Sequence, residues 1–165
     1  MPLVSISYSH REPLSWANWR ATVPHGLPAD LYKLGNGSPG YLAFIGRISP
    51  EKRLDRAIEI AQRVGLPLRI AAKIDQVDRK YFDKSIRPLL SLPNVEYLGE
   101  INDSEKAAFL GGAAALLFPI DWPEPFGLSM IEAMANGTPV VAFRHGAVPE
   151  VIDEGITGFV VDNLD

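Results

Sequence analysis

The fold is indicated by residues 41–67, which read YLAFIGRISPEKRLDRAIEIAQRVGLP. A short apolar run, Tyr41 to Gly46, predicts a buried strand, and the amphipathic stretch after it predicts a helix over Glu51 to Val64. Apolar side chains recur on one stripe of this helix, and charged side chains cover the rest. Gly65 and Pro67 then end it, so the segment is one complete unit of strand and helix.

The same unit repeats along the chain. Further strands are expected at Pro67 to Lys73, Val95 to Gly99, Ala114 to Pro119, Pro139 to Phe143 and Gly158 to Asp162. Further helices are expected at Asp78 to Leu90, Ser104 to Leu110, Gly127 to Asn136 and Val148 to Asp153. Such alternation requires right-handed crossovers, so the predicted class is α/β, a doubly wound parallel sheet of about six strands with helices on both faces.

Residues 1–40 do not show this alternation of strand and helix. Val4 to Tyr8 alternates like a strand, but serine, proline and glycine punctuation follows it. We expect residues 1–40 to be a remnant of a preceding domain and a linker, and residues 41–165 to form the folded domain. The dinucleotide fingerprint that Gly35 to Gly40 spells is assigned to the linker, because it precedes a strand instead of following one.

Composition narrows the class of protein. The chain has 165 residues, 47% of them hydrophobic and 22% charged, which is typical of one globular domain. Its net charge of −4 argues against a nucleic-acid partner, and the lack of cysteine excludes disulfides and thiolate metal sites. Neither a signal peptide nor a membrane span is visible, so we expect a cytoplasmic protein.

The first candidate site is the turn after the first strand, Gly46 to Lys52. It lies at the carboxyl edge of the sheet, where open α/β folds bind ligands. Arg47 and Lys52 can each donate charge-assisted hydrogen bonds to a phosphate there. Solvated surface cations are the alternative, although positive charge near a helix start is slightly unfavourable, which favours a ligand role.

The second candidate site is DWPEPFGLSMIEAMANG, residues 121–137. A proline-stiffened loop leads to a helix that is apolar nearly all round and is therefore expected to be buried. Glu132 is its one acidic side chain, and its partner is either a hydroxylated ligand or, alternatively, nearby backbone or an arginine. The backbone amides of Phe126, Gly127 and Leu128 begin this helix and offer an anion site.

Two other chemistries are not favoured. A glycosidase carboxylate pair needs a separation of about 5 to 9.5 Å, whereas eight helical residues between Glu124 and Glu132 span roughly 12 Å. The histidines, His10, His25 and His145, have neither metal-ligand spacing nor an evident acidic partner. We therefore expect no metal site.

The motif EPFGLSMIEAM, residues 124–134, resembles the E-x7-E signature of retaining GT-B glycosyltransferases of family 4, also called glycosyltransferase group 1. Gly46 to Lys52 resembles the donor-phosphate segment of that family, and Val23 to Pro28 resembles its passage between domains. The resemblance covers residues 41–162 in consistent order, including Gly137 to Ala142, Val148 to Val151 and Gly158 to Val160.

The resemblance implies a carboxyl-terminal, Rossmann-like donor-binding domain, one half of a GT-B fold, whose amino-terminal acceptor domain is separate or missing. Arg47 and Lys52 would hold the diphosphate of a nucleotide sugar, and Glu132 would bond the ribose. Glu124 would be the catalytic contact to the sugar at the reacting face. The helix amides at Phe126, Gly127 and Leu128 would meet the distal phosphate.

By this resemblance the donor is a UDP-, ADP- or GDP-sugar, and no metal or other cofactor is required, since cations and the helix dipole stabilise the departing diphosphate. The chain departs from the family at Arg53, where a glycine is often seen, and at His145-Gly146-Ala147, where paired glycines are often seen. Two functions stay open: a glycosyltransferase donor domain, and a noncatalytic nucleotide-binding module. A homodimer that covers the interdomain face with residues 1–40 is a third hypothesis.

Overall fold

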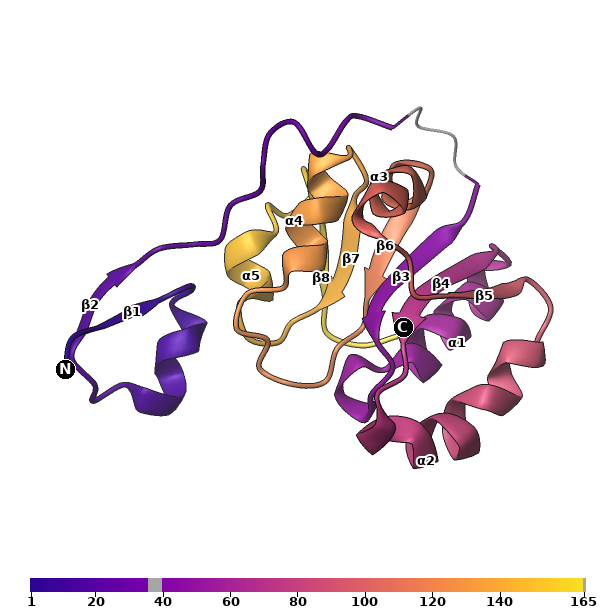
Figure 1. Cartoon of the computed structure of the whole chain (residues 1–165), viewed down its shortest axis with the longest axis horizontal. Coiled ribbons are helices and arrows are strands. Elements are labelled where there is room, and N and C mark those ends of the chain that lie inside the picture. Colours follow the sequence, from indigo (N-terminus) through magenta and orange to yellow (C-terminus); the bar gives the residue numbers. More distant parts are fainter. Residues whose placement is uncertain (36–39, 165) are drawn as a thin grey trace.

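The computed structural model describes residues 1–35 and 40–164, so the interior of the Gly35 to Gly40 match lies outside the described residues. A parallel sheet of six strands forms the centre of the molecule (Figure 1). Its spatial order is β5 (Val95–Gly99), β4 (Leu68–Lys73), β3 (Leu42–Arg47), β6 (Ala115–Phe118), β7 (Val140–Phe143) and β8 (Gly158–Val161). The six predicted strands are confirmed to within a residue at each end.

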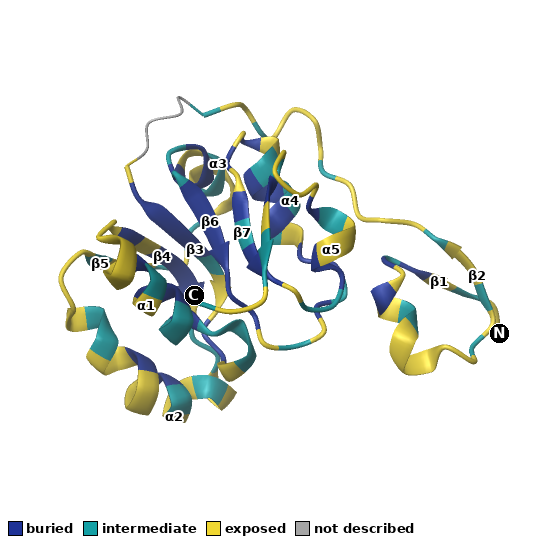
Figure 2. Cartoon of the chain, turned by 180° about the vertical axis from the view of Figure 1, so that it is seen from behind, coloured by how far each residue is buried: buried dark blue, intermediate teal, exposed yellow. Residues whose placement is uncertain are grey.

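Helices cover both faces of this sheet. One face carries α3 (Asp103–Gly111), α4 (Leu128–Ala135) and α5 (Val148–Val151), and the other carries α1 (Leu54–Val64) and a helical run that begins at α2 (Arg79–Tyr81). Successive side chains of β3 enter the cores on opposite faces of the sheet. Ala43 packs in the core beneath α3, α4 and α5, and Leu42 and Phe44 pack in the core beneath α1. The doubly wound α/β class is therefore confirmed, and Figure 2 shows its central strands buried.

Two predicted helices differ from the structure. The helix expected over Glu51 to Val64 is interrupted at Arg53, whose φ of 52° is left-handed, and a 3-10 turn, η2 (Pro50–Lys52), precedes α1. The helix expected over Asp78 to Leu90 begins with a 3-10 turn, η3 (Gln76–Asp78), and α2, and then changes to a π turn, η4 (Phe82–Ile86), and a 3-10 turn, η5 (Arg87–Ser91). Pro88 lies in η5 and has no N–H to continue α-helical bonding.

The amino-terminal segment has more regular structure than the sequence predicts. It contains β1 (Leu3–Ser5), η1 (Ser9–Leu14) and β2 (Trp19–Thr22), and the two strands pair in parallel. Arg11 joins them, because its guanidinium donates to the Ser5 hydroxyl at 2.8 Å and to that of Thr22. Polar contacts join the two strands, so the alternation at Val4 to Tyr8 was the one strand signal in this part of the sequence.

This segment is bound to the six-stranded domain. The Glu150 carboxylate at α5 accepts the backbone N–H groups of Tyr8 and Ser9, both at 2.7 Å. The Ser7 hydroxyl donates to the Pro125 carbonyl at 2.6 Å, in the loop that precedes α4. The contacts therefore hold the amino-terminal segment beside the second candidate site.

Replacing Glu150 with alanine should release this segment. The two lost bonds are charge-assisted, so we expect the free energy of local opening to fall by about 1.5–3 kcal/mol. Hydrogen exchange at the Tyr8 and Ser9 amides should then accelerate about 10–100-fold. Glu12→Ala, which removes an exposed carboxylate of η1, is the matched control. Unchanged exchange in Glu150→Ala would show that these bonds do not hold the segment.

Candidate ligand cleft

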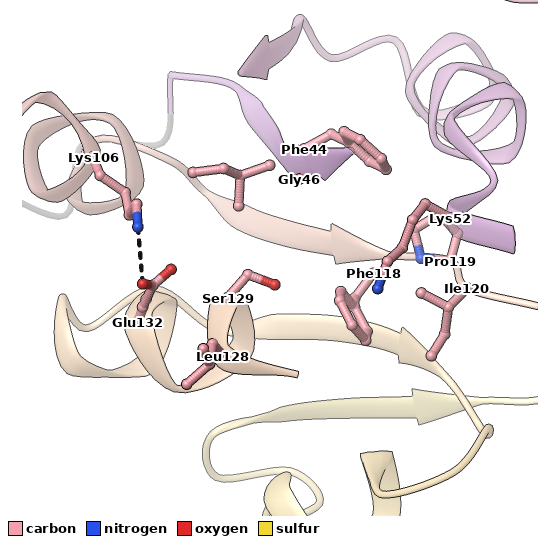
Figure 3. Close-up of a pocket in the computed structure, with 11 residues that line it drawn as sticks. Phe44, Gly46, Lys52, Lys106, Phe118, Pro119, Ile120, Leu128, Ser129 and Glu132 are labelled. Atoms are coloured by element: carbon pink, nitrogen blue, oxygen red, sulfur yellow. Dashed lines mark hydrogen bonds and ion pairs between the residues drawn. The ribbon is translucent and has the colours of Figure 1, made fainter. Parts of the chain in front are cut away.

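A cleft opens where the order of strands reverses. The chain runs outward from β3 through β4 to β5, and then returns to β6 and runs outward through β7 to β8. Ligands of open α/β sheets bind at this switch point, beside the carboxyl ends of the strands. The cleft has a volume of about 250 Å³ and is shown in Figure 3. Its lining residues are Phe44, Ile45, Gly46, Lys52, Lys106, Phe118, Pro119, Ile120, Leu128, Ser129 and Glu132.

Lys52 and Glu124 meet at one end of the cleft. The Lys52 ammonium pairs with Oε2 of Glu124, and the Trp122 indole donates to the same oxygen at 3.1 Å. Glu124 is 8% exposed, so this cation and indole satisfy a buried carboxylate. The Lys52 ammonium also lies 5.1 Å from the Trp122 ring centre and 5.5 Å from that of Phe118. The structure therefore brings together two residues that the sequence assigned to a site.

Glu132 lies at the other end, on the first turns of α4, and is 9% exposed. Its Oε1 accepts from Lys106 Nζ at 2.9 Å and from the Tyr32 hydroxyl at 3.2 Å. Neither donor was predicted from the sequence. Burial opposes the charge of Lys106, but its bonds to Glu132 and Asp103 raise the pKa of Lys106 overall. Burial and the Glu132 charge also raise the pKa of Tyr32.

The amino end of α4 reaches the cleft at Leu128 and Ser129. Gly127 begins this helix with a φ of 86°, and a Cβ there would lie 2.5 Å from the Met130 methyl carbon. Only glycine fits both the backbone and the space. Phe126 is buried, and its ring packs edge-on against His25 at 5.1 Å between ring centres. Of the three residues whose amides were predicted as an anion site, Leu128 lines this cleft, whereas Phe126 and Gly127 are not among its lining residues.

Arg47 is placed differently from Lys52. Its guanidinium pairs with Glu51 and lies 3.5 Å from Asp78 and 3.8 Å from Asp75. The hydrogen bond to Glu51 and these negative charges raise the pKa of Arg47. At the end of β3, Gly46 is among the described residues that line the cleft, and Arg47 is not. The guanidinium is therefore directed at neighbouring carboxylates.

At both places where the sequence departs from the pattern it resembles, the backbone is left-handed at one residue. Arg53 adopts the left-handed backbone that a glycine would favour, and its guanidinium pairs with Asp55 at 2.9 Å and Asp121 at 2.8 Å. Gly146 is left-handed too, with a φ of 57°, and the next N–H, that of Ala147, donates to the Glu124 carbonyl at 2.8 Å. The turns beside Lys52 and Glu124 are thus anchored on defined partners.

The described part of the chain holds no group of three or more histidine, aspartate or glutamate side chains placed to bind a metal ion. None of the helices described is both long and apolar enough to cross a membrane. Lys52, Lys106 and Glu132 line the cleft together with the amino end of α4, and Glu124 pairs with Lys52.

Fold and cleft together define the class: a Rossmann-like domain with a candidate ligand cleft at the switch point of its sheet. The family described as glycosyl transferases group 1 matches residues 33–165. The chain belongs to this family, as the motifs in its sequence indicated.

Known relatives and structures agree with this assignment. The chain is 34% identical over 137 residues to D-inositol 3-phosphate glycosyltransferase of Mycobacterium sp. (strain KMS), covering 75% of this chain and 29% of that protein. A crystal structure of HepE of Anabaena in complex with UDP and glucose superposes with a TM-score of 0.83 at 20% identity, over 96% of this chain and 48% of that one. The carboxyl-terminal domain of LpcC of Francisella tularensis gives a TM-score of 0.65 at 22% identity, over 82% and 80%.

The matched relatives are longer than this chain. It spans less than a third of the D-inositol 3-phosphate glycosyltransferase and about half of the HepE chain. The sheet and its flanking helices therefore correspond to one half of a GT-B fold, which confirms the predicted architecture.

Proposed function

We propose that this chain is the carboxyl-terminal donor-binding domain of a retaining, family 4 hexosyltransferase that uses a nucleotide-diphosphate sugar. The observation that supports this most is the pairing of Lys52 with Glu124 and of Lys106 with Glu132 on either side of the amino end of α4. Such an arrangement suits a ligand with an anionic centre and hydroxyl groups at both ends. The structural relative HepE is in complex with UDP and glucose.

In this proposal each group in the cleft has one role. The diphosphate lies between the Lys52 ammonium and the first turn of α4, including the amides of Phe126, Gly127 and Leu128. Glu132 accepts a ribose hydroxyl. Glu124 accepts sugar hydroxyls at the reacting face, after Lys52 has turned from its carboxylate toward the phosphates. The base lies beside the loop from Gly99 to Asn102, which ends at the cap of α3.

These groups lower the barrier by stabilising the leaving group. As the bond from the sugar to the diphosphate breaks, negative charge grows on the phosphate oxygen that departs, and a cation and a helix end placed there stabilise the transition state. The step requires no metal in this proposal. Arg47 contributes to diphosphate binding beside Lys52 only after its guanidinium has left Glu51, Asp75 and Asp78. A separate amino-terminal domain binds the acceptor, and the reaction takes place in the cytoplasm.

A thermal-shift panel of UDP, ADP and GDP and their sugars tests the proposal. A ligand at about 100 times its Kd should add about 2.7 kcal/mol to the free energy of unfolding. For a chain of this size that corresponds to a rise in Tm of about 5–10 °C. The free nucleosides and inorganic pyrophosphate are the controls, since each supplies one part of the ligand. If no nucleoside diphosphate or its sugar raises the Tm above these controls, the assignment of the cleft is wrong.

Turnover separates an enzyme from a binding module. Release of nucleoside diphosphate from a sugar donor is expected when an acceptor domain is supplied. Stabilisation by the same donor with no release under any such condition would instead indicate a noncatalytic nucleotide-binding domain.

A further inference from the structure

Each of the two carboxylates at or beside the cleft is paired with one lysine. Lys52 faces Glu124 and Lys106 faces Glu132, and both carboxylate side chains are largely buried, at 11% and 12% exposed. Without Lys106, Glu132 would lose its ammonium partner and keep the Tyr32 hydroxyl as a donor. A nucleoside diphosphate would then have to enter beside an uncompensated, buried negative charge.

Lys106 also fixes which oxygen of Glu132 is available. Both donors to this carboxylate, Lys106 Nζ and the Tyr32 hydroxyl, act on Oε1. In Figure 3 the dashed bond joins Lys106 to one oxygen of Glu132, and the other oxygen lies on the cleft side. That second oxygen is therefore free to accept a hydroxyl group of a ligand.

The position of Lys106 is set by a rigid helix. Asn102 caps α3 with a complete capping box, in which its side chain accepts from Glu105 N at 3.1 Å and Glu105 accepts from Asn102 N at 2.9 Å. Later in the helix, Leu110 is fully buried in the core under the sheet. The ammonium has one further partner, the exposed Asp103 at 3.2 Å. Lys106 is thus 21% exposed and directed across the cleft at α4.

We propose that Lys106 is a positioning residue for ribose recognition, holding Glu132 in one orientation and balancing its charge so that it can accept a ribose hydroxyl next to an anionic diphosphate. This inference rests on the proposed function of the cleft. Lys106 makes no covalent step and need not touch the ligand. Its role is visible in the ability of the site to distinguish a ribose from a deoxyribose.

Calorimetry on the 165-residue chain tests this role, with whichever of UDP, ADP and GDP binds best and its 2′-deoxy and 3′-deoxy forms. Wild type should bind at least one deoxy form about tenfold more weakly, because the Glu132 oxygen loses its hydroxyl partner. Lys106→Met should weaken binding of the ribose form about tenfold and reduce the discrimination to less than about threefold. Lys106→Arg should restore most of the discrimination.

Two control variants separate positioning from general damage. Lys80→Met removes an exposed lysine outside the cleft and should leave affinity and discrimination unchanged. Glu132→Gln should lose discrimination as Lys106→Met does, and it tests the same contact if Lys106→Met does not fold. Equal weakening of all three ligands in Lys106→Met, with discrimination preserved, would overturn the positioning role and leave the proposed function intact. Failure of every nucleoside diphosphate to bind wild type would instead overturn both.

Discussion

Replacing Lys52 with methionine should weaken the binding of a nucleoside diphosphate by about 1.5–3 kcal/mol, which is a rise in Kd of about 10–150-fold. The variant keeps a long apolar side chain but removes the ammonium that lies over the rings of Phe118 and Trp122. It also leaves Glu124, 8% exposed, without its cation, so the ligand-free chain should lose about 1–3 kcal/mol of stability. Calorimetry measures the first effect, and urea unfolding measures the second.

Arg47→Met is the matched control for this variant. The guanidinium of Arg47 already has Glu51, Asp75 and Asp78 as partners, so binding through it must first break those contacts. We expect removal of this guanidinium to raise Kd less than about tenfold, because the free energy it gains from the ligand is partly offset by the contacts it loses with its carboxylates. An unchanged Kd in Lys52→Met would remove Lys52 from the phosphate site. A larger loss in Arg47→Met than in Lys52→Met would show that Arg47 leaves its carboxylates when the ligand binds.

The sheet was predictable because local signals agree with the global fold. Most strands are short apolar runs next to a glycine or proline residue, and α1 has one apolar stripe. The run from Asp78 to Leu90 was predicted as one helix because periodicity detects a helical face and not the change in bonding that produces η4 and η5. Arg53 was included in a helix because nothing in a side chain reports a left-handed backbone.

The site was predictable only where it lies in one continuous motif. Glu124, Glu132 and the start of α4 belong to a single segment, so their common location follows from the sequence. Lys106 and Tyr32 contact Glu132 from 26 and 100 residues away, and such contacts require the assembled layers. The partners of Arg47 pose the same problem, because Asp75 and Asp78 follow the neighbouring strand β4 and meet Arg47 only when β3 and β4 pair.

Replacing Gly146 with alanine should destabilise the chain by about 2–5 kcal/mol and displace Glu124. The residue has a left-handed φ of 57°, which costs a side-chain-bearing residue about 1–2 kcal/mol. A Cβ there would lie 2.3 Å from both the backbone nitrogen and oxygen of Glu124. Backbone atoms cannot rotate away, so the loop must move, at a further cost of about 1–3 kcal/mol. Urea unfolding and nucleoside diphosphate affinity are the two measurements.

Gly155→Ala is the control that separates backbone strain from the steric clash with Glu124. Gly155 has a similar φ of 75°, but nothing lies within 4 Å of a Cβ added there. We expect this control to lose only the backbone cost, about 1–2 kcal/mol, and to bind ligand like wild type. Gly146→Ala should lose affinity as well, since the moved loop carries Glu124 away from Lys52 and shifts the entry to α4. Equal stability losses in the two variants, with affinity intact in both, would show that the loop holding Glu124 does not depend on close approach at Gly146.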